Sequence, residues 1–214
     1  MENQQQSTIV DDEISVKQDL AAIGLSTELI RKIAFAAAAG RAESLRVDPV
    51  SAPGQLAYIH GVRELRLGLE REGWKINRDG NVEATVNYDL GIQLFFQNVD
   101  RACSKRNPQA ISRKGKASRD LVAAGQTDMF TELSHDVGEN VHGAVPTVWI
   151  VCVSSDGRSV RAEVSRPKRF EGSQFEDFHH RIFVLDESFE PGFEPSVRDS
   201  DTFDDFDVKI SRKL

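Results

Sequence analysis

The chain has 214 residues, of which 39% are hydrophobic and 29% are charged, and its formal net charge is −7. These values fit one globular domain and exclude collagen-like, mucin-like and coiled-coil proteins. No apolar run approaches the roughly 20 residues that a membrane-spanning helix needs, and the first residues lack the pattern of a secretory signal. We therefore expect a cytosolic protein that does not cross a membrane.

The first third of the chain is predicted to be helical after a short arm. Residues 1–14 are polar and acidic, so we expect a disordered or frayed arm. Residues 15–73 form the predicted helical segment. Ser15 and Gln18 have the spacing of a capping box for a first helix that Gly24 ends. Ser26 is predicted to cap a second helix, and the apolar spacing of residues 55–72 predicts a third.

The third helix carries glycine at every seventh position, at Gly54, Gly61 and Gly68. Glycines at that spacing fall nearly on one face of a helix. The alanine-rich residues 34–39 of the second helix would fit against such a face. We therefore predict close packing of these two segments. Two alternatives remain open: a ligand groove, or a spacing that has no structural meaning.

Residues 74–214 are predicted to form a sheet that packs on the helices within the same domain. Apolar residues alternate with polar ones over residues 74–86 around Asp79-Gly80, which predicts a β-hairpin. Residues 91–97 form a predicted third strand. A second hairpin is predicted over residues 147–165 around Asp156-Gly157. Its first strand is apolar on both faces, so it should be central in the sheet.

The return strand of the second hairpin should point Val160, Ala162 and Val164 inward, with Arg161 and Glu163 outward. Beyond it we predict a short helix over residues 173–178, a strand over residues 181–185 and a last strand over residues 206–210. Helices followed by hairpins predict an α+β fold with a mostly antiparallel sheet.

A long basic loop is the strongest candidate for a binding site. It holds seven cations and no carboxylate, and glycine, proline and serine interrupt any helical periodicity. Such a loop is typical of contact with a polyanion such as nucleic acid, or with an acidic protein surface. Ala110 stands where a Walker phosphate-binding loop needs glycine. The alternative is a solvated loop without a ligand. The seven cations are Arg101, Lys105, Arg106, Arg113, Lys114, Lys116 and Arg119.

An acidic and aromatic segment follows at residues 186–207, where nine carboxylates stand against the single cation Arg198. Four phenylalanines, Phe189, Phe193, Phe203 and Phe206, lie among them. The simplest interpretation is a surface segment whose phenylalanines dock on the sheet. Alternatively, it binds a protein partner, mimics nucleic-acid phosphates, or occupies the protein's own basic loop.

Besides the basic loop and the acidic segment, the sequence offers a third candidate site, that of a metal-dependent hydrolase or nuclease centred on His135 and His142. Metal-capable side chains cluster there, but Gly138 and Gly143 would break the helix needed to hold them rigidly. A polar connecting loop is therefore favoured over a metal site. The cluster consists of Asp128, Glu132, His135, Asp136, Glu139 and His142. We expect His179 and His180 to lie at a helix end, and His60 to be structural.

The two cysteines have contrasting surroundings in the sequence. Cys103 lies among cations, which would lower its pKa and favour the reactive thiolate, while Cys152 lies in an apolar strand and should be inert. Motifs for phosphate, dinucleotide or other cofactor binding are absent from the sequence, so we expect no cofactor. The sequence favours a non-catalytic binding module that acts through the basic loop.

Overall fold

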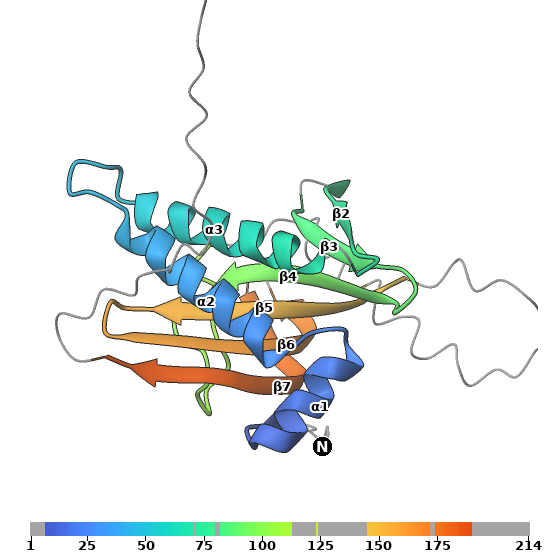
Figure 1. Ribbon diagram of the computed structural model, residues 1–214. Coiled ribbons are helices and arrows are strands. Elements are labelled where there is room, and N and C mark those ends of the chain that lie inside the picture. Colours follow the sequence, from blue (N-terminus) through green and yellow to red (C-terminus); the bar gives the residue numbers. More distant parts are fainter. Residues whose placement is uncertain are drawn as a thin grey trace, which may run out of the picture.

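The computed structural model describes residues 7–70, 72–79, 82–112, 123, 145–171 and 174–189. Within them lies a seven-stranded sheet with the strand order β1-β7-β6-β5-β4-β3-β2 (Figure 1). The β1–β7 and β4–β5 pairs are parallel and the others are antiparallel. The predicted α+β fold is confirmed. The strands are β1 (Thr8–Val10), β2 (Lys75–Asn77), β3 (Ala84–Asn87), β4 (Ile92–Asn98), β5 (Thr147–Ser155), β6 (Ser159–Glu171) and β7 (Gln174–Ser188).

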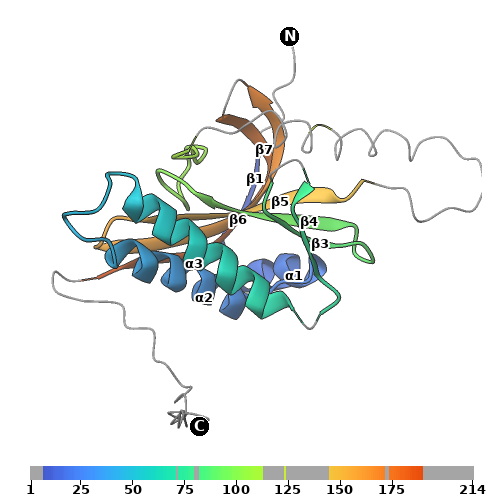
Figure 2. The same ribbon diagram turned by 90° about the horizontal axis from the view of Figure 1, so that it is seen from above.

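Three helices, α1 (Glu13–Ala22), α2 (Thr27–Ala42) and α3 (Ala52–Leu69), cover one face of the sheet (Figures 1 and 2). Helix α1 begins earlier than predicted, because the Asp12 side chain rather than Ser15 caps it by accepting a hydrogen bond from the Ser15 N–H. The predicted cap of α2 is confirmed, since Ser26 accepts from the Leu29 N–H. In the part of the chain that the structure describes, no helix is long and apolar enough to cross a membrane.

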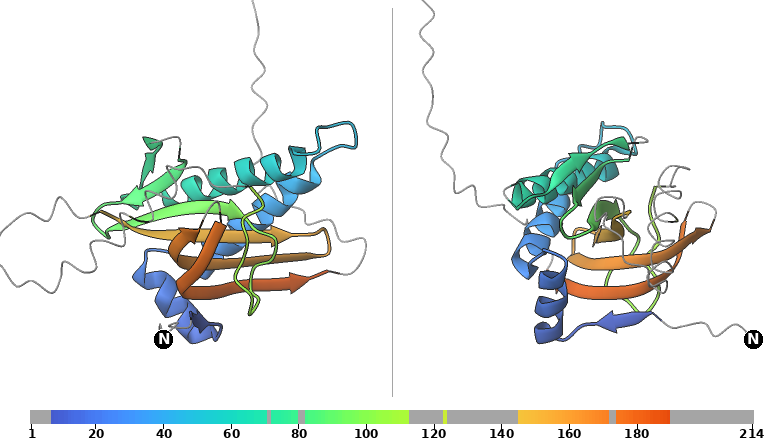
Figure 3. Two further views of the ribbon diagram at one scale, coloured as in Figure 1. Left: turned by 180° about the vertical axis from the view of Figure 1, so that it is seen from behind. Right: turned by 90° about the vertical axis from the view of Figure 1, so that its right-hand side faces the viewer.

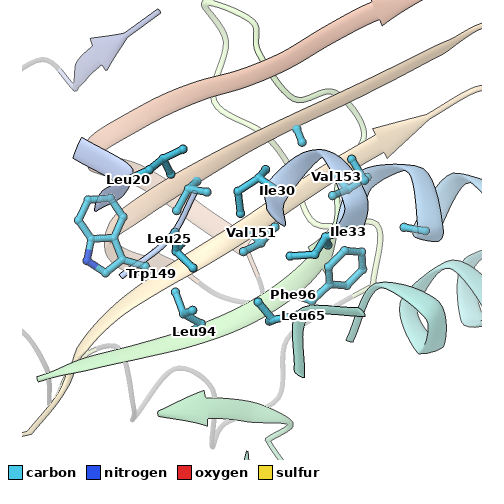
Figure 4. Close-up of a cluster of buried hydrophobic side chains, with 14 of the residues drawn as sticks. Leu20, Leu25, Ile30, Ile33, Leu65, Leu94, Phe96, Trp149, Val151 and Val153 are labelled. Carbon is cyan, nitrogen blue, oxygen red and sulfur yellow. The ribbon is translucent and has the colours of Figure 1, made fainter. Parts of the chain in front are cut away.

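The main core lies between these helices and the sheet (Figure 4). Leu20, Ile30 and Ile33 from the helices are fully buried against Leu94 and Val151 of the sheet. Burying one such side chain contributes about 1.5–3 kcal/mol to folding. The predicted strand over residues 91–97 is therefore confirmed as β4, and Leu94 and Phe96 on one of its faces belong to this core.

The glycine stripe of α3 packs differently from the prediction. Gly61 faces the ring of Phe96 on β4, and only Gly68 faces α2, where it meets Leu29. Gly54 has open space beside it. The close approach of the two helices occurs instead at Gly40 of α2, where an added Cβ would lie 2.9 Å from the Leu56 carbonyl oxygen. The prediction that all three glycines face residues 34–39 is wrong, because α3 lies over β4 as well as beside α2.

Both predicted hairpins are present, although the first has a longer connection. Asn77 pairs with Ala84, so residues 78–83 rather than a two-residue turn join β2 to β3. The second hairpin turns at Gly157, whose φ of +79° suits glycine. Strand β5 is the middle strand and is buried on both faces, as predicted.

Two local predictions for the sheet are wrong. Residues 174–178 belong to strand β7 rather than to a short helix, because β6 continues to Glu171 and pairs with them. This pairing overrides a local helix-capping signal. The predicted strand over residues 181–185 is confirmed as part of β7, and the predicted strand over residues 206–210 lies outside the described residues.

The N-terminal arm also differs from its prediction. Thr8, Ile9 and Val10 form strand β1, which pairs with residues 180–182 of β7, and helix α1 begins at Glu13. The frayed-arm prediction is therefore wrong for residues 8–14, because the edge of β7 supplies backbone partners. Residues 1–6 lie outside the described part of the chain.

The face of the sheet opposite the helices carries a second, smaller core. Phe95 of β4 and Ile150 and Cys152 of β5 are buried there, as are Phe175 and Phe178 of β7. Residues 99–111, which follow β4, lie across this face over the central strands and β7 (Figure 3). Val99, Ala102 and Ala110 of this segment are the apolar residues that complete the second core. The first part of the predicted basic loop is thus packed on the sheet.

Candidate polyanion-binding loop

Backbone hydrogen bonds close residues 99–111 into a loop with a narrow neck. The Asp100 N–H donates to the Gln109 carbonyl oxygen at 2.9 Å, and the Ile111 N–H donates to that of Asn98 at 3.0 Å. The Asp100 carboxylate also accepts hydrogen bonds from the Arg101 and Gln109 N–H groups. The loop therefore has a defined path from β4 out to its tip and back. We call residues 99–111 the sheet-bound loop.

A buried ion pair lies under the tip of the sheet-bound loop. Glu163 of β6 and Arg181 of β7 have no exposed surface. Arg181 Nη2 lies 2.7 Å from Glu163 Oε2, and Arg181 Nε lies 2.9 Å from Glu163 Oε1. The hydroxyl of Ser165 donates a further hydrogen bond to this carboxylate at 2.8 Å. This two-point geometry with additional donors is what a buried ion pair needs to offset its desolvation.

The same ion pair holds the loop backbone. The Cys103 N–H donates to Glu163 Oε2 at 2.6 Å, and Arg181 Nη1 donates to the carbonyl oxygens of Ser104 at 3.0 Å and Arg106 at 3.4 Å. The Arg181 guanidinium also lies over the rings of Phe178 and Phe183. One carboxylate and one guanidinium thus fix the backbone of residues 103–106.

The sequence did not predict that Glu163 and Arg181 hold the backbone of residues 103–106. The prediction that Glu163 points outward to solvent is wrong, because the sheet-bound loop covers it. The alternation along β6 places Glu163 correctly on the face opposite Val160, Ala162 and Val164, which are buried as predicted. The pattern contains no sign that a loop from elsewhere in the chain covers that face.

Cys103 is held at the loop tip as a neutral thiol. Its backbone has a φ of +53°, and its Sγ lies 3.2 Å from the carbonyl oxygens of both Ala162 and Leu185. Burial raises the pKa of the Cys103 thiol to about 12, and the negative charge of Glu163 adds to the rise. The prediction of a lowered pKa is therefore wrong, because burial beside a carboxylate outweighs the neighbouring cations. Cys152 is fully buried, as predicted.

The cations of the sheet-bound loop lie on its outer side. Arg101, Lys105 and Arg106 are exposed. Arg106 Nη2 makes a surface ion pair with Asp100 Oδ2 at 2.7 Å. The structure thus brings three of the seven predicted binding residues together above the buried ion pair. The other four, Arg113, Lys114, Lys116 and Arg119, lie outside the described residues.

Of the histidines in the described residues, His60 and His180 lie beside carboxylates of the protein itself. His180 Nε2 lies 2.8 Å from Asp19 Oδ2 of α1, and His180 packs beside the Trp149 ring. Both His179 and His180 belong to strand β7, so their predicted place at a helix end is wrong. Burial, together with Arg166 and Lys168, lowers the pKa of His179. His60 lies 3.4 Å from Glu43 and beside Gly40, which fits a structural role.

The metal hypothesis falls on residues that the structure does not describe. All six members of the predicted cluster, from Asp128 to His142, lie in that part of the chain. Among the residues that are described, no group of three or more histidine, cysteine, aspartate or glutamate side chains could hold a metal ion.

The first residues of the acidic segment have partners within the protein. Asp186 pairs with Arg161 at 2.6 Å, and Glu187 pairs with Arg31 of α2. The Phe189 ring lies 6.1 Å from that of Phe35 and packs against the main core. The start of this segment therefore docks on the folded domain, but Phe189 lies beside Phe35 of α2 rather than on the sheet, where the simplest interpretation places it. Residues 190–207 lie outside the described residues.

Comparison with known proteins gave no match to a protein-family model, to a curated protein or to a solved structure.

Proposed function

We propose that this protein is a non-catalytic, cytosolic binding module that engages nucleic acid through the basic residues of positions 101–119. The observation that carries the proposal is the buried Glu163–Arg181 pair, which fixes the backbone of residues 103–106 while Arg101, Lys105 and Arg106 face solvent. A fixed loop loses less conformational freedom on binding than a free one. Exposed cations that follow one another on such a loop can meet successive phosphates.

The proposed binding is largely independent of nucleotide sequence. No aromatic residue lies between positions 101 and 119, so this segment offers no ring on which a base could stack. Counterion release from the phosphates would then supply most of the affinity. We expect duplex DNA and RNA of different sequences to bind with similar affinities.

The test is the salt dependence of binding to a short DNA duplex. For the unaltered protein we expect log affinity to fall linearly with log salt, with a slope of about −0.9 per phosphate neutralised. Replacing Arg101, Lys105 and Arg106 with alanine should weaken binding for every duplex and make the slope shallower by roughly one unit for each phosphate that is no longer neutralised. The triple variant of Arg113, Lys114 and Lys116 should do the same.

A matched control replaces three exposed cations elsewhere, Lys32, Arg63 and Lys75, with alanine. It changes the net charge by the same amount and should leave the slope nearly unchanged. Equal losses of affinity in control and loop variants would mean that net charge, rather than the loop, attracts DNA. Absence of any binding at about 50 mM salt would refute the nucleic-acid proposal. Binding to an acidic protein that depends on the same cations would then support the acidic-surface alternative.

A further inference from the structure

The connection between α2 and α3 exposes three large apolar side chains. Leu45, Val47 and Val50 are 67%, 82% and 101% exposed. This connection, residues 43–51, projects beyond the sheet at one end of the molecule (Figures 1 and 2). We call it the apical loop. Single exposed apolar residues are common, but three within six positions of one projecting loop are typical of a contact surface.

The apical loop has a defined shape of its own. The Leu45 N–H donates to Asp48 Oδ2 at 2.8 Å, and the Asp48 N–H returns a hydrogen bond to the Leu45 carbonyl oxygen at 3.0 Å. The Ala52 N–H donates to the Pro49 carbonyl oxygen at 2.8 Å. These bonds fix the backbone of the loop, and its three apolar side chains are exposed to solvent. A partner would therefore meet a surface that is already ordered, which lowers the entropic cost of binding.

The charges of the apical loop favour an acidic partner. The Asp48 carboxylate accepts a hydrogen bond from the Leu45 N–H, and the Glu43 carboxylate lies 3.4 Å from His60. Arg46 stands between the apolar residues, is exposed, and has no acidic partner among the residues that the structure describes. The loop thus offers apolar contacts around a cation. An occupant with aromatic rings and carboxylates would complement both.

The chain itself supplies such a segment, and it starts nearby. Glu187 and Phe189 attach the end of the described chain to Arg31 and Phe35 of α2, the helix that leads into the apical loop. From Phe35 to the end of α2 at Ala42 is about 10 Å along the helix axis, at 1.5 Å per residue. Residues 190–203 could extend up to about 45 Å, at roughly 3.3 Å per residue. The phenylalanines and carboxylates of residues 203–207 are therefore within reach of the loop.

We propose that the apical loop is an intramolecular docking site for the acidic and aromatic residues 203–207. Phe203 and Phe206 would contact Leu45, Val47 and Val50, and the carboxylates between and beside them would face Arg46. This inference does not depend on the basic loop or on nucleic-acid binding. Such docking would leave the sheet-bound loop free for its own ligand.

The experiment places a nitroxide spin label on a Ser200→Cys variant of the full chain and records the amide signals by NMR. Cys152 is fully buried and Cys103 is largely so, and a labelling reaction on the unaltered protein verifies that neither accepts the label. We expect a marked loss of amide signal at Leu45, Val47 and Val50. The amides of Ile76, on the edge strand β2, and of Leu90, in the turn between β3 and β4, should keep their intensity.

Two variants identify the contact. A Phe203→Ser/Phe206→Ser variant should restore the apical-loop signals, and so should a Leu45→Ser/Val47→Ser/Val50→Ser variant. The affected loop side chains are exposed, so their replacement should leave the fold intact. A Val47→Ile variant, which keeps the apolar surface, should retain the signal loss. Persistence of the loss in both serine variants would overturn the proposal.

Three further outcomes would also overturn it. Loss of signal at residues 101–106 instead of the apical loop would show that the acidic segment binds the basic loop. In a mixture of spin-labelled chains with isotope-labelled chains that carry no spin label, a loss of equal size would identify a second copy as the occupant. No loss at any described residue would likewise refute docking. DNA affinity of the apical-loop serine variant should equal that of the unaltered protein, so the two proposals fail independently.

Discussion

Gly61 of α3 lies against the ring of Phe96 on β4, so closely that an added Cβ would overlap three ring carbons. Phe96 is only 2% exposed, so its ring has little room to move aside. An interior glycine costs a helix about 1 kcal/mol relative to alanine. The contact with Phe96 explains why the helix contains glycine at this position. It also brings α3 close enough to the sheet to close one side of the main core.

Replacing Gly61 or Gly54 of α3 with alanine should change the stability of the protein differently. Gly61→Ala should destabilise the protein by about 1–3 kcal/mol, the usual cost of overpacking a core. Gly54→Ala should be neutral or stabilising by up to about 1 kcal/mol, because nothing lies within 4 Å of the added Cβ. Urea unfolding measures both changes. Equal effects at the two positions would contradict the packing described here.

Removing one partner of the Glu163–Arg181 pair should destabilise the protein strongly, whereas removing both charges together should destabilise it less than the two single changes added. Glu163→Gln leaves a buried guanidinium without its counter-charge and should lower the free energy of unfolding by about 3–5 kcal/mol. A Glu163→Gln/Arg181→Met double variant should cost less than the sum of the two single variants, because neither charge is then buried alone. As a control, Arg161→Met removes a more exposed pair with Asp186 and should cost about 1 kcal/mol or less. Additive losses of stability would show that the buried charges act independently.

The elements that could be predicted from sequence are those whose signals are local. The alternation of apolar residues predicted β4 and the first hairpin, a continuous apolar run predicted β5, and the Ser26 cap predicted the start of α2. Errors arose where distant segments meet: β1 depends on the edge of β7, and Glu163 depends on the sheet-bound loop. The hairpin of β6 and β7 overrode a capping pattern at residues 173–176 for the same reason.

The candidate site was predictable only in part. A run of cations is visible in any sequence, so Arg101, Lys105 and Arg106 were found directly. The buried Glu163–Arg181 pair that holds the loop backbone could not be predicted in the same way, because Arg181 is 78 positions away from Cys103 and no motif links the two. Asp100 was also overlooked, since it lies just before the basic run. Its roles in the neck of the loop and in pairing with Arg106 become visible only in three dimensions.

The Cys103 thiol predicts a loss of stability at alkaline pH. Its pKa is about 12 in the folded protein against an ordinary value of 9.0. Below pH 9 both states keep the proton, so the contribution is complete. As the pH rises from 9 towards 12, the unfolded chain loses the proton and the folded protein retains it. Folding stability therefore falls, by at most about 1.4 kcal/mol per pH unit from this group.

A Cys103→Ser variant isolates this effect, because serine does not titrate in the range and can donate to the same carbonyl oxygens. The difference in free energy of unfolding between the unaltered protein and the variant should be constant from pH 7 to about pH 8.5. It should then shift in favour of the variant as the pH rises further. Denaturant unfolding at a series of pH values measures it. A difference that stays constant up to pH 11 would mean that the folded-state pKa of Cys103 is close to that of a free thiol.

Asp100 should restrain polyanion binding by the sheet-bound loop. Its carboxylate pairs with Arg106 and puts a negative charge beside the three exposed cations. An Asp100→Asn variant keeps an oxygen that can accept from the Arg101 and Gln109 N–H groups, so the loop should keep its path. Removing the charge frees Arg106 for a phosphate. We expect DNA affinity to rise about two- to fivefold, corresponding to roughly 0.5–1 kcal/mol for an exposed ion pair.

The matched control is Asp89→Asn, which removes another exposed negative charge, in the turn between β3 and β4. It changes the net charge of the protein by the same amount, so any general electrostatic gain appears in both variants. Fluorescence anisotropy with a labelled duplex at two salt concentrations distinguishes a local effect at the loop from this general electrostatic gain. A larger gain for Asp100→Asn, shrinking as salt rises, supports a local effect at the loop. Equal gains for the two variants would show that DNA responds only to net charge, and a weaker affinity for Asp100→Asn would show that the carboxylate is needed to hold the loop in its binding shape.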